Sequence, residues 1–214
     1  MMVKIAPSML AADFLHLSES ADIVNRYADI FHLDIMDGRF VPNISFGFPV
    51  VEAIAKIAKR PMDVHLMIQH PQVYIERFAA TGAKMISFHL EAVHDPEPVL
   101  GLIKNNGCKA GLVINPDKPV ESLFPYLEEC DYILLMSVFA GFGGQKFIED
   151  TYDRIRILKA EIVRRGLKTQ IEIDGGVSPA NAKLLAEAGA DILVAGSAVF
   201  KSENPRETIN QMKL

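Results

Sequence analysis

Histidine and aspartate alternate with apolar residues in one short stretch of the chain, His32-Leu33-Asp34-Ile35-Met36. An alternation with a period of two is typical of a β-strand, so His32 and Asp34 would lie on the face opposite Leu33 and Ile35. Burying an ionised carboxylate is unfavourable unless a metal ion, a cation or an opening to water compensates for it. The stretch is therefore either a solvated strand end with an incidental ion pair or part of a site that does chemistry.

Two further residues of ligand type stand in similar surroundings, His65 in Asp63-Val64-His65-Leu66-Met67 and Asp174 before Gly175-Gly176. A lone histidine is more often a core residue, and Asp174 could simply hold a turn. Two imidazoles and two carboxylates together suit a divalent transition ion such as Zn²⁺, Fe²⁺, Mn²⁺ or Co²⁺, whereas Mg²⁺ and Ca²⁺ prefer oxygen ligands. If the side chains of His32, Asp34, His65 and Asp174 converge, we expect one such ion as cofactor.

Glycine-rich segments form a second candidate group, and they are Gly141-Phe142-Gly143-Gly144, Gly175-Gly176 and Gly196-Ser197. Glycine lets backbone N–H groups approach an anion closely, so three such segments predict a phosphate site built mainly from amides. The N-terminus of the last helix would assist. Lys146 is either an additional phosphate contact or a solvated residue at a helix start.

Three methionines, Met36, Met67 and Met136, stand at the ends of predicted strands. Methionine at such positions is either core filling or an adaptable apolar wall beside a reacting carbon atom. Both interpretations are open at this stage.

The elements that must position these residues alternate along the whole chain. The predicted strands cover 3–8, 30–36, 62–67, 85–89, 109–115, 132–137, 170–174 and 191–195, and the predicted helices cover 13–27, 47–59, 71–81, 96–106, 119–129, 148–165, 178–188 and 204–213. This α/β pattern predicts a (β/α)8 TIM barrel, as a single domain over residues 1–214. A doubly wound open sheet is the alternative, but it normally has fewer units and a nucleotide-binding fingerprint after its first strand.

Polar residues lie at or near the C-terminal ends of these predicted strands: Ser8, His32, Asp34, His65, His89, Asn115, Ser137 and Asp174, with Gly196-Ser197 after the eighth. In a parallel barrel those ends form one face, where active sites are built. The convergence favours a chemical role for His32 and Asp34, whereas we assign none to His89. Deeper in the barrel, we interpret Lys4 and Glu172 as a buried ion pair.

The composition excludes several classes of protein. The net charge of −5 argues against nucleic acid or an anionic membrane as the main partner. The N-terminus lacks the pattern of a signal peptide, and no apolar run approaches the roughly 20 residues of a membrane span. Cys108 and Cys130 are isolated and are interpreted as buried residues in a reducing compartment. We therefore expect a soluble, cytoplasmic protein that acts on a small molecule, and we expect it to be a homo-oligomer.

The chain resembles the ribulose-phosphate 3-epimerase family from its first predicted strand to its last helix. The matching motifs are Ala6-Pro7-Ser8, His32-Leu33-Asp34-Ile35-Met36-Asp37-Gly38 with Phe40-Val41-Pro42-Asn43, Asp63-Val64-His65-Leu66-Met67, Gly141-Phe142-Gly143-Gly144-Gln145, Glu172-Ile173-Asp174-Gly175-Gly176-Val177 and Ala195-Gly196-Ser197. The resemblance implies a metal-dependent isomerase of the pentose phosphate pathway, which inverts C3 of D-ribulose 5-phosphate to give D-xylulose 5-phosphate through an ene-diolate.

The resemblance also implies roles for single residues. His32, Asp34, His65 and Asp174 would hold the metal, and Asp34 and Asp174 would exchange the proton on the two faces of the substrate. Ser8 and His65 would contact the substrate. Apart from the resemblance, we assign Met36, Met67 and Met136 to the substrate site as its apolar wall. The phosphate end would be lined by Gly141, Phe142, Gly143, Gly144, Gly175, Gly176, Gly196 and Ser197.

One position departs from the family pattern. The family usually has an acidic residue or Asn followed by Pro before Gly-Phe-Gly-Gly, whereas this chain has Phe139-Ala140. We therefore expect its discrimination between ribulose 5-phosphate and the six-carbon allulose 6-phosphate to differ from that of other members. A 3-epimerase of allulose 6-phosphate is the main alternative function.

Alternatives from other classes are a phosphosugar decarboxylase, an aldol-type enzyme and a phosphosugar-binding barrel without activity. The decarboxylase lineage tends to carry Asp-x-Lys-x-x-Asp at a strand end, but Asp34-Ile35-Met36-Asp37 has no lysine. A Schiff-base aldolase also needs a lysine at a strand end. A binding barrel would not need the two histidines and two aspartates.

Overall fold

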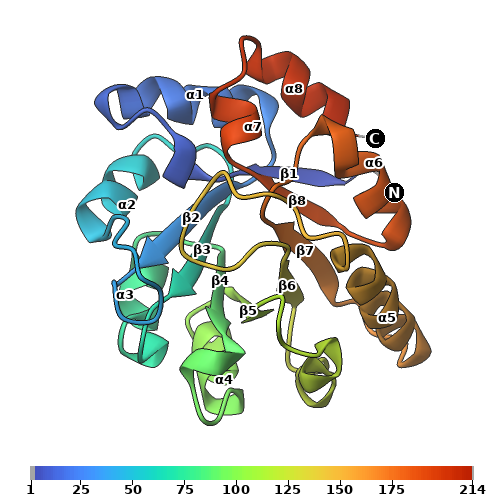
Figure 1. The fold of residues 1–214 in the computed structure, drawn as a ribbon. Helices are drawn as coiled ribbons and strands as arrows, with labels where there is room; N and C mark the ends of the chain where they lie inside the picture. Colours follow the sequence, from blue (N-terminus) through green and yellow to red (C-terminus); the bar gives the residue numbers. More distant parts are fainter. Residues whose placement is uncertain (1–2, 214) are drawn as a thin grey trace.

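Eight parallel strands form a barrel in the computed structural model, which describes residues 3–213 (Figure 1). The strands are β1 (Lys4–Pro7), β2 (Phe31–Met36), β3 (Met62–Met67), β4 (Met85–His89), β5 (Lys109–Ile114), β6 (Tyr132–Met136), β7 (Gln170–Asp174) and β8 (Ile192–Ala195). From β2 to β8 each strand pairs with the next one in the sequence, and β8 pairs with β1. A parallel bridge between Ser8 and His32 connects β1 with β2. The predicted (β/α)8 fold is confirmed.

The helices surround this barrel. They are α1 (Leu17–Tyr27), α2 (Phe48–Ala55), α3 (Ile75–Ala80), α4 (Glu97–Asn105), α5 (Thr151–Arg164), α6 (Pro179–Ala188), α7 (Ser197–Phe200) and α8 (Pro205–Met212), with 3₁₀ turns η1 (Met9–Ala11), η2 (Phe14–His16), η3 (Pro71–Val73), η4 (Leu90–Ala92) and η5 (Val120–Tyr126). Ser178 and Asn181 form a capping box at the start of α6, which explains why this helix begins where expected.

Several predictions about helices were wrong in detail. The helix predicted over 71–81 divides into the turn η3 and the shorter helix α3. The segment 119–129 is the 3₁₀ helix η5, because Pro125 lies inside it and has no N–H for an α-helical hydrogen bond. The helix predicted from residue 13 begins at Leu17, since Asp13 caps the separate turn η2. The helix that follows Gly196 is the unpredicted four-residue α7, not the last helix α8.

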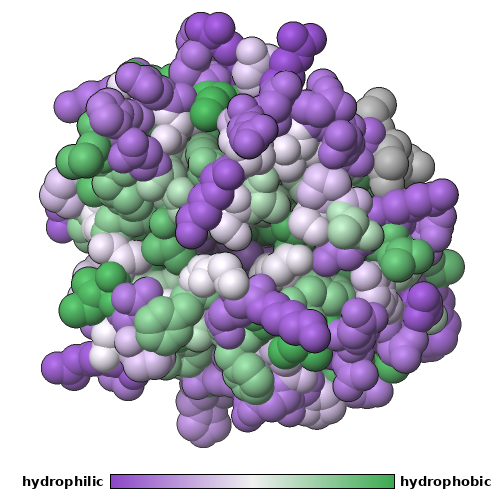
Figure 2. Space-filling view, turned by 45° about the horizontal axis from the view of Figure 1, so that its top comes forward, coloured by the Kyte–Doolittle hydropathy of each residue, from purple (hydrophilic) through white to green (hydrophobic). Residues whose placement is uncertain are grey.

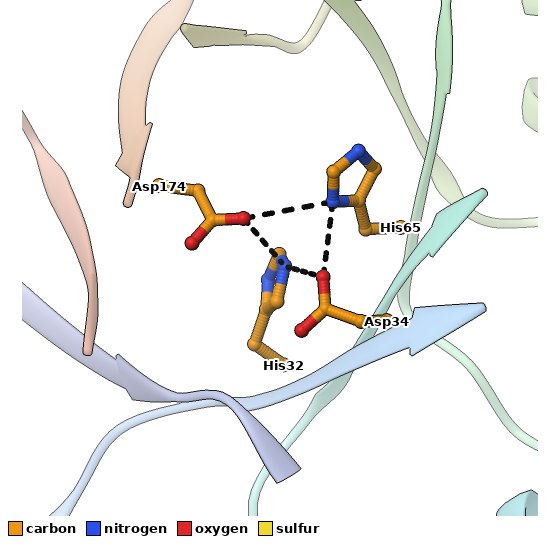
Figure 3. A group of neighbouring side chains, drawn as sticks. All are labelled: His32, Asp34, His65 and Asp174. Atoms are coloured by element: carbon orange, nitrogen blue, oxygen red, sulfur yellow. Dashed lines mark hydrogen bonds and ion pairs between the residues drawn. The ribbon is translucent and has the colours of Figure 1, made fainter. Parts of the chain in front are cut away.

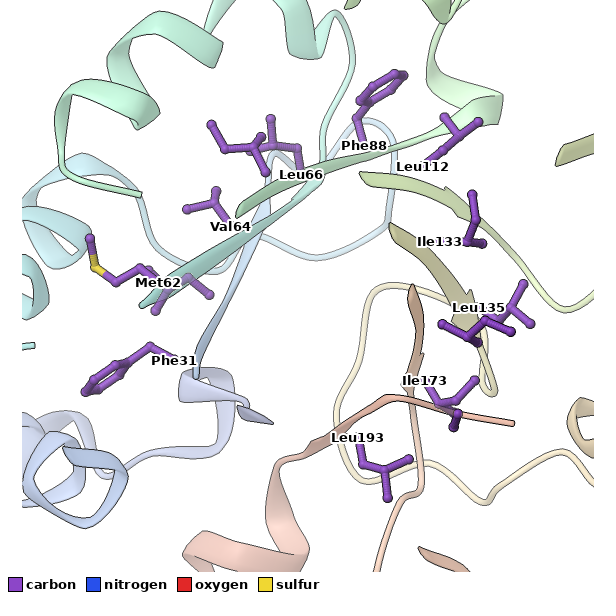
Figure 4. Packing of buried hydrophobic residues seen from close by; sticks show 14 of the residues in the cluster. Phe31, Met62, Val64, Leu66, Phe88, Leu112, Ile133, Leu135, Ile173 and Leu193 are labelled. Carbon is purple, nitrogen blue, oxygen red and sulfur yellow. The ribbon is translucent and has the colours of Figure 1, made fainter. Parts of the chain in front are cut away.

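Most of the core lies between the barrel and the helices. Alternate strand residues point outward into it, among them Phe31, Val64, Phe88, Leu135 and Ile173 (Figure 4). The barrel interior holds smaller apolar clusters, one around Tyr132 and two around the methionines near the strand ends. This division follows from the period of two, because one parity of each strand faces the helices and the other faces the interior.

The predicted Lys4–Glu172 ion pair is wrong. Glu172 does face the interior and is fully buried, but Lys4 is exposed. Lys4 is the first residue of β1, so its long side chain lies at the bottom rim of the barrel and reaches water. Cys108 and Cys130 are buried, as expected.

None of the helices in the described part of the chain is long and apolar enough to cross a membrane.

Candidate metal and substrate site

Four side chains from three strands bring their donor atoms together inside the barrel (Figure 3). Asp34 Oδ1 lies 3.4 Å from His32 Nε2 and 3.2 Å from His65 Nδ1. Asp174 Oδ2 lies 3.9 Å from His32 Nε2 and 3.8 Å from His65 Nδ1. The four residues predicted as metal ligands are therefore brought together at one point.

The spacing and chemistry of this set fit a divalent transition ion. Four ligands at about 2.0–2.2 Å from one tetrahedral ion stand roughly 3.3–3.6 Å from one another. The four distances between a histidine nitrogen and a carboxylate oxygen of this set are 3.2–3.9 Å, close to that range, and all four donor atoms lie within 4.8 Å of one another. His32 Nε2 is also buried and has no hydrogen-bond partner among the described residues. A bound cation would supply the partner that this nitrogen lacks.

A second layer of polar residues lies beneath His32. Its Nδ1 atom is 2.8 Å from Asp63 Oδ2, and the Tyr132 hydroxyl donates to Asp63 Oδ1 at 2.7 Å. A carboxylate that accepts from Nδ1–H leaves the lone pair of Nε2 facing the donor set. Asp63 and Tyr132 were not predicted as site residues. The strand parity that Asp63 shares with His65 was the signal that could have found it.

The two aspartates of the set have opposite pKa shifts. Burial alone would raise the pKa of Asp34, but the imidazoles of His32 and His65 hold it well below its usual range. Burial and the nearby Asp34 carboxylate raise the pKa of Asp174 to about 7. One carboxyl is thus ionised while the other holds or releases a proton near neutrality, which is the arrangement that acid–base chemistry requires.

The two histidines differ as well. Burial lowers the pKa of His65 to about 4, so this ring is neutral and has a free lone pair. Burial would also lower the pKa of His32, but Asp34 and Asp63 raise it well above its usual value. A cation in the donor set would replace the His32 proton.

A cavity of about 440 Å³ opens above the donor set at the C-terminal ends of the strands. It is lined by Asp34, Asp174 and the predicted substrate residues Ser8, Met36, Met67, Met136, Gly141, Phe142, Gly143, Gly144, Gly175, Gly176, Gly196 and Ser197. His65 is not among the lining residues and is fully buried beneath them. A direct contact of His65 with substrate therefore stays a prediction.

The loop between β6 and α5 passes over the middle of the barrel (Figure 1, yellow). Gln145 Nε2 donates to the carbonyls of Phe139 and Phe142, at 2.7 and 2.8 Å, and Asn43 Nδ2 donates to the Gly141 carbonyl at 2.7 Å. These contacts hold the glycine segment over the cavity.

Several lining residues were missed by sequence reasoning: Leu10, Asn43, Val138, Gln145, Val177 and Lys201. Lys201 stands four residues after Ser197, one helical turn further along, and this spacing was the signal that could have found it. Lys146 is exposed and does not line the cavity. Hydrophilic, neutral and apolar residues are mixed over this face of the molecule (Figure 2).

The polar residues of the site are fixed by local hydrogen bonds. Ser8 Oγ donates to Asp34 Oδ2 at 2.5 Å, so Ser8 both lines the cavity and orients a carboxylate. Ser137 Oγ donates to the carbonyls of Asp174 and Gly175, at 2.9 and 2.6 Å, and thereby holds the turn after β7. Each of these side chains stands at a strand end, as predicted.

Comparisons with known proteins concern the fold and the family of the chain. In solved structures, the fold matches KGPDC from Streptococcus mutans (TM-score 0.74, 11% identity, 99% of this chain and 96% of that chain). It also matches 3-hexulose-6-phosphate synthase from Salmonella typhimurium (TM-score 0.68, 18% identity, 98% and 96% covered). At these identities the likeness shows a shared fold alone.

Sequence relatives are much more similar. The chain is 44% identical to ribulose-phosphate 3-epimerase of Bacillus subtilis, with 99% of each covered. It is 47% identical to the enzyme of that name from Synechocystis, with 97% of this chain and 91% of that protein covered. The model of the ribulose-phosphate 3 epimerase family matches residues 4–200. The chain therefore belongs to the ribulose-phosphate 3-epimerase family.

Proposed function

We propose that this enzyme inverts C3 of D-ribulose 5-phosphate to give D-xylulose 5-phosphate, and that it needs a divalent metal ion to do so. The observation that carries the proposal is the pair Asp34 and Asp174, which belong to the donor set and line the cavity from β2 and β7. β2 and β7 are separated by β1 and β8 around the barrel, so the two carboxylates approach a bound substrate from different sides. Inverting a carbon atom requires a proton to leave one face and another to reach the opposite face.

The metal would be Zn²⁺, Fe²⁺, Mn²⁺ or Co²⁺, held by His32 Nε2, Asp34 Oδ1, His65 Nδ1 and Asp174 Oδ2. When bound, such an ion supplies a Lewis acid that polarises a ketone and stabilises the ene-diolate formed when C3 loses its proton. This assistance matters because carboxylates are weak bases for a carbon acid.

Each aspartate has one oxygen outside the donor set. For Asp34 it is Oδ2, which is held by the Ser8 hydroxyl, and for Asp174 it is Oδ1. One carboxylate takes the C3 proton on its face, and the other, in its protonated form, delivers a proton to C3 on the opposite face. The two roles exchange in the reverse reaction. In the metal-free site the pKa of Asp174 lies near 7, so at neutral pH this carboxyl holds a proton about as readily as it releases one.

The remaining lining residues would bind the rest of the substrate. The phosphate lies by Gly141–Gly144, Gly175-Gly176 and Gly196-Ser197, where backbone N–H groups can donate to it and Lys201 adds a positive charge. Met36, Met67 and Met136 form an apolar wall over the reacting carbon. The cavity volume of about 440 Å³ suits a small phosphosugar.

Two alternatives differ in what they require. A 3-epimerase of allulose 6-phosphate would use the same donor set and carboxylates, so only substrate preference separates it. A binding barrel without activity would not need two carboxylates with opposite pKa shifts. We also propose that the protein is a homo-oligomer.

The test is a coupled assay of purified protein with D-ribulose 5-phosphate and with D-allulose 6-phosphate, combined with elemental analysis of the same sample. We expect epimerisation of ribulose 5-phosphate with the higher kcat/KM, and about one transition ion per chain. Preference for allulose 6-phosphate would overturn the substrate. Full activity in a sample free of metal would overturn the cofactor.

A further inference from the structure

The two histidines of the donor set have different partners at the ring nitrogen that faces away from the set. His32 Nδ1 lies against the carboxylate of Asp63, as is usual behind a metal-binding imidazole. The partner behind His65 is a second imidazole, because His65 Nε2 lies 2.9 Å from His89 Nε2. His89 is fully buried at the end of β4, and its ring stacks on His65 with ring centres 5.1 Å apart. His89 has no part in the function proposed above.

The proton positions in this pair follow from the donor set. If His65 presents the lone pair of Nδ1 to a cation, its proton is on Nε2. That N–H must then donate to His89 Nε2, so His89 carries its own proton on Nδ1. His89 Nδ1 is buried without a hydrogen-bond partner among the described residues, and the carboxylate oxygen Glu91 Oε2 faces it at 3.7 Å. The chain of donors runs in one direction, from His65 through His89 toward Glu91.

Glu91 is itself held at its other oxygen. The backbone N–H and the side-chain amide of Asn115 donate to Glu91 Oε1, at 3.0 and 3.1 Å. Asn115 is anchored in turn, because Arg154 donates to its carbonyl at 3.0 Å. Glu91 Oε2 is therefore directed at His89 by two hydrogen bonds on Oε1, although Glu91 lies well outside the donor set.

We propose that His89 and Glu91 are positioning residues, which hold His65 in the tautomer and orientation that bind the metal ion. This inference rests on the metal site proposed above. The pair does for His65 what Asp63 does for His32, with an imidazole inserted between ligand and carboxylate. The two carboxylates differ in one respect, because Asp63 contacts His32 directly whereas Glu91 acts on His65 through His89.

The experiment measures binding of Co²⁺ to the metal-free protein, by competition with a chromophoric chelator and by the visible absorption of the bound ion. His89→Gln places an amide oxygen near the position of Nε2 and can still accept from His65, whereas His89→Leu has similar bulk and no acceptor. In Glu91→Gln, the amide oxygen must face the Asn115 donors. Its NH₂ group then opposes the N–H of His89, so the donor chain is broken. Glu97→Gln, an exposed position at the start of α4, is the matched control.

We expect His89→Leu and Glu91→Gln to bind Co²⁺ about 10–100-fold more weakly than wild type, with an altered visible spectrum. His89→Gln and Glu97→Gln should stay within about threefold of wild type. Circular dichroism reports whether each metal-free variant is folded. If His89→Leu is unfolded, the Co²⁺ affinity of Glu91→Gln tests the positioning role instead.

Wild-type affinity and spectrum in both His89→Leu and Glu91→Gln would overturn the positioning role. Equal weakening in His89→Gln and His89→Leu would do so as well, because the acceptor would then not be the cause. Failure of the wild-type protein to bind Co²⁺ would instead overturn the metal site itself, and with it this inference.

Discussion

Gly111 on β5 stands directly beside Tyr132 on β6 in the sheet, and a methyl group on Gly111 would overlap the tyrosine ring. The glycine therefore leaves space for the ring to lie over the backbone of β5 inside the barrel. From there the hydroxyl of Tyr132 reaches Asp63 on β3, which supports His32. A residue with no side chain thus shapes the support of a metal-ligating histidine.

The first prediction concerns this space. Gly111→Ala should lower the free energy of unfolding by roughly 1–3 kcal/mol, because the buried ring cannot move aside without straining the interior. Gly101→Ala in α4 is the control, since no described heavy atom lies within 4 Å of the added methyl group. That control should gain about 0.4–1 kcal/mol from reduced flexibility of the unfolded chain. Urea unfolding measures both. Equal stabilities of the two variants would contradict the argument.

The second prediction concerns Glu172, whose two carboxyl oxygens are buried without a hydrogen-bond partner in the part of the chain described. Burial and the nearby Asp63 raise the pKa of Glu172 from 4.5 to about 8. Because this pKa is higher in the folded state, the contribution of Glu172 to stability is fully present below pH 4.5 and is lost as the pH rises toward 8.

The neutral Glu172→Gln variant lacks this titration. In a chelating buffer, the free energy of unfolding of wild type relative to Glu172→Gln should fall steadily between about pH 5 and pH 8. Urea titrations at several pH values test it. A difference that does not vary with pH would show that the buried carboxyl does not titrate in this range.

The third prediction concerns proton release on metal binding. Burial and Asp34 raise the pKa of Asp174 to about 7, and neighbouring carboxylates raise that of His32 well above its usual value. Both groups must lose a proton before they can coordinate an ion, so the affinity should fall as the pH drops below 7. Calorimetry in buffers of different ionisation enthalpy should detect release of more than one proton per ion near pH 6.5. An affinity for Co²⁺ that is constant from pH 6 to pH 8 is the contrary result.

The fourth prediction concerns the two carboxylates. Asp34→Asn and Asp174→Asn should each lower kcat by at least about 10²–10⁴-fold, since each loses a proton-transfer group and a ligand. Each variant that still holds metal should exchange the C3 proton of only one of the two epimers with deuterated solvent, the epimer whose proton faces the remaining carboxylate. NMR of the recovered sugar phosphate measures this exchange. Near wild-type turnover in Asp174→Asn would show that this residue is not a base.

Strand parity accounts for how much of the site could be predicted. Because alternate residues of a strand face the interior, His32, Asp34, His65 and Asp174 could be assigned to one face without coordinates. Contacts between residues on different sides of the barrel could not be predicted, because they depend on how far each strand is shifted relative to the next. Parity placed Glu172 in the interior correctly, but the exposed Lys4 is not its partner.

The residues that contact the metal-ligating histidines from behind could not be identified from the sequence. His89 was recognised as a strand-end residue without a role, because its contact with His65 depends on the side-chain angles of both rings. The helix predicted over 119–129 failed for a local reason, the proline within it. Regular spacing therefore predicts the secondary-structure elements and the face on which each residue lies. Contacts between individual side chains can be assigned only from the three-dimensional structure.

The last prediction concerns Phe139-Ala140, where the chain departs from its family. Neither residue lines the cavity, and half of Phe139 is exposed, so the pair acts on the substrate only through the loop that follows it. The N–H of Ala140 donates to Asn115 Oδ1 at 3.0 Å. A proline at this position has no N–H and would leave that oxygen without its donor. The stabilisation expected of a proline in a loop is therefore absent here.

Ala140→Pro should instead cost about 0.5–1.5 kcal/mol of stability and raise KM for ribulose 5-phosphate, because the loop over the phosphate is held less firmly. Phe139→Asn keeps the backbone hydrogen bond and is the control. Neither side chain touches the cavity, so, contrary to the expectation drawn from the sequence, the pair should not set substrate discrimination. The ratio of kcat/KM for ribulose 5-phosphate to that for allulose 6-phosphate should stay within about twofold in both variants. A changed ratio in Phe139→Asn alone would show that the phenylalanine reaches the substrate when the loop closes.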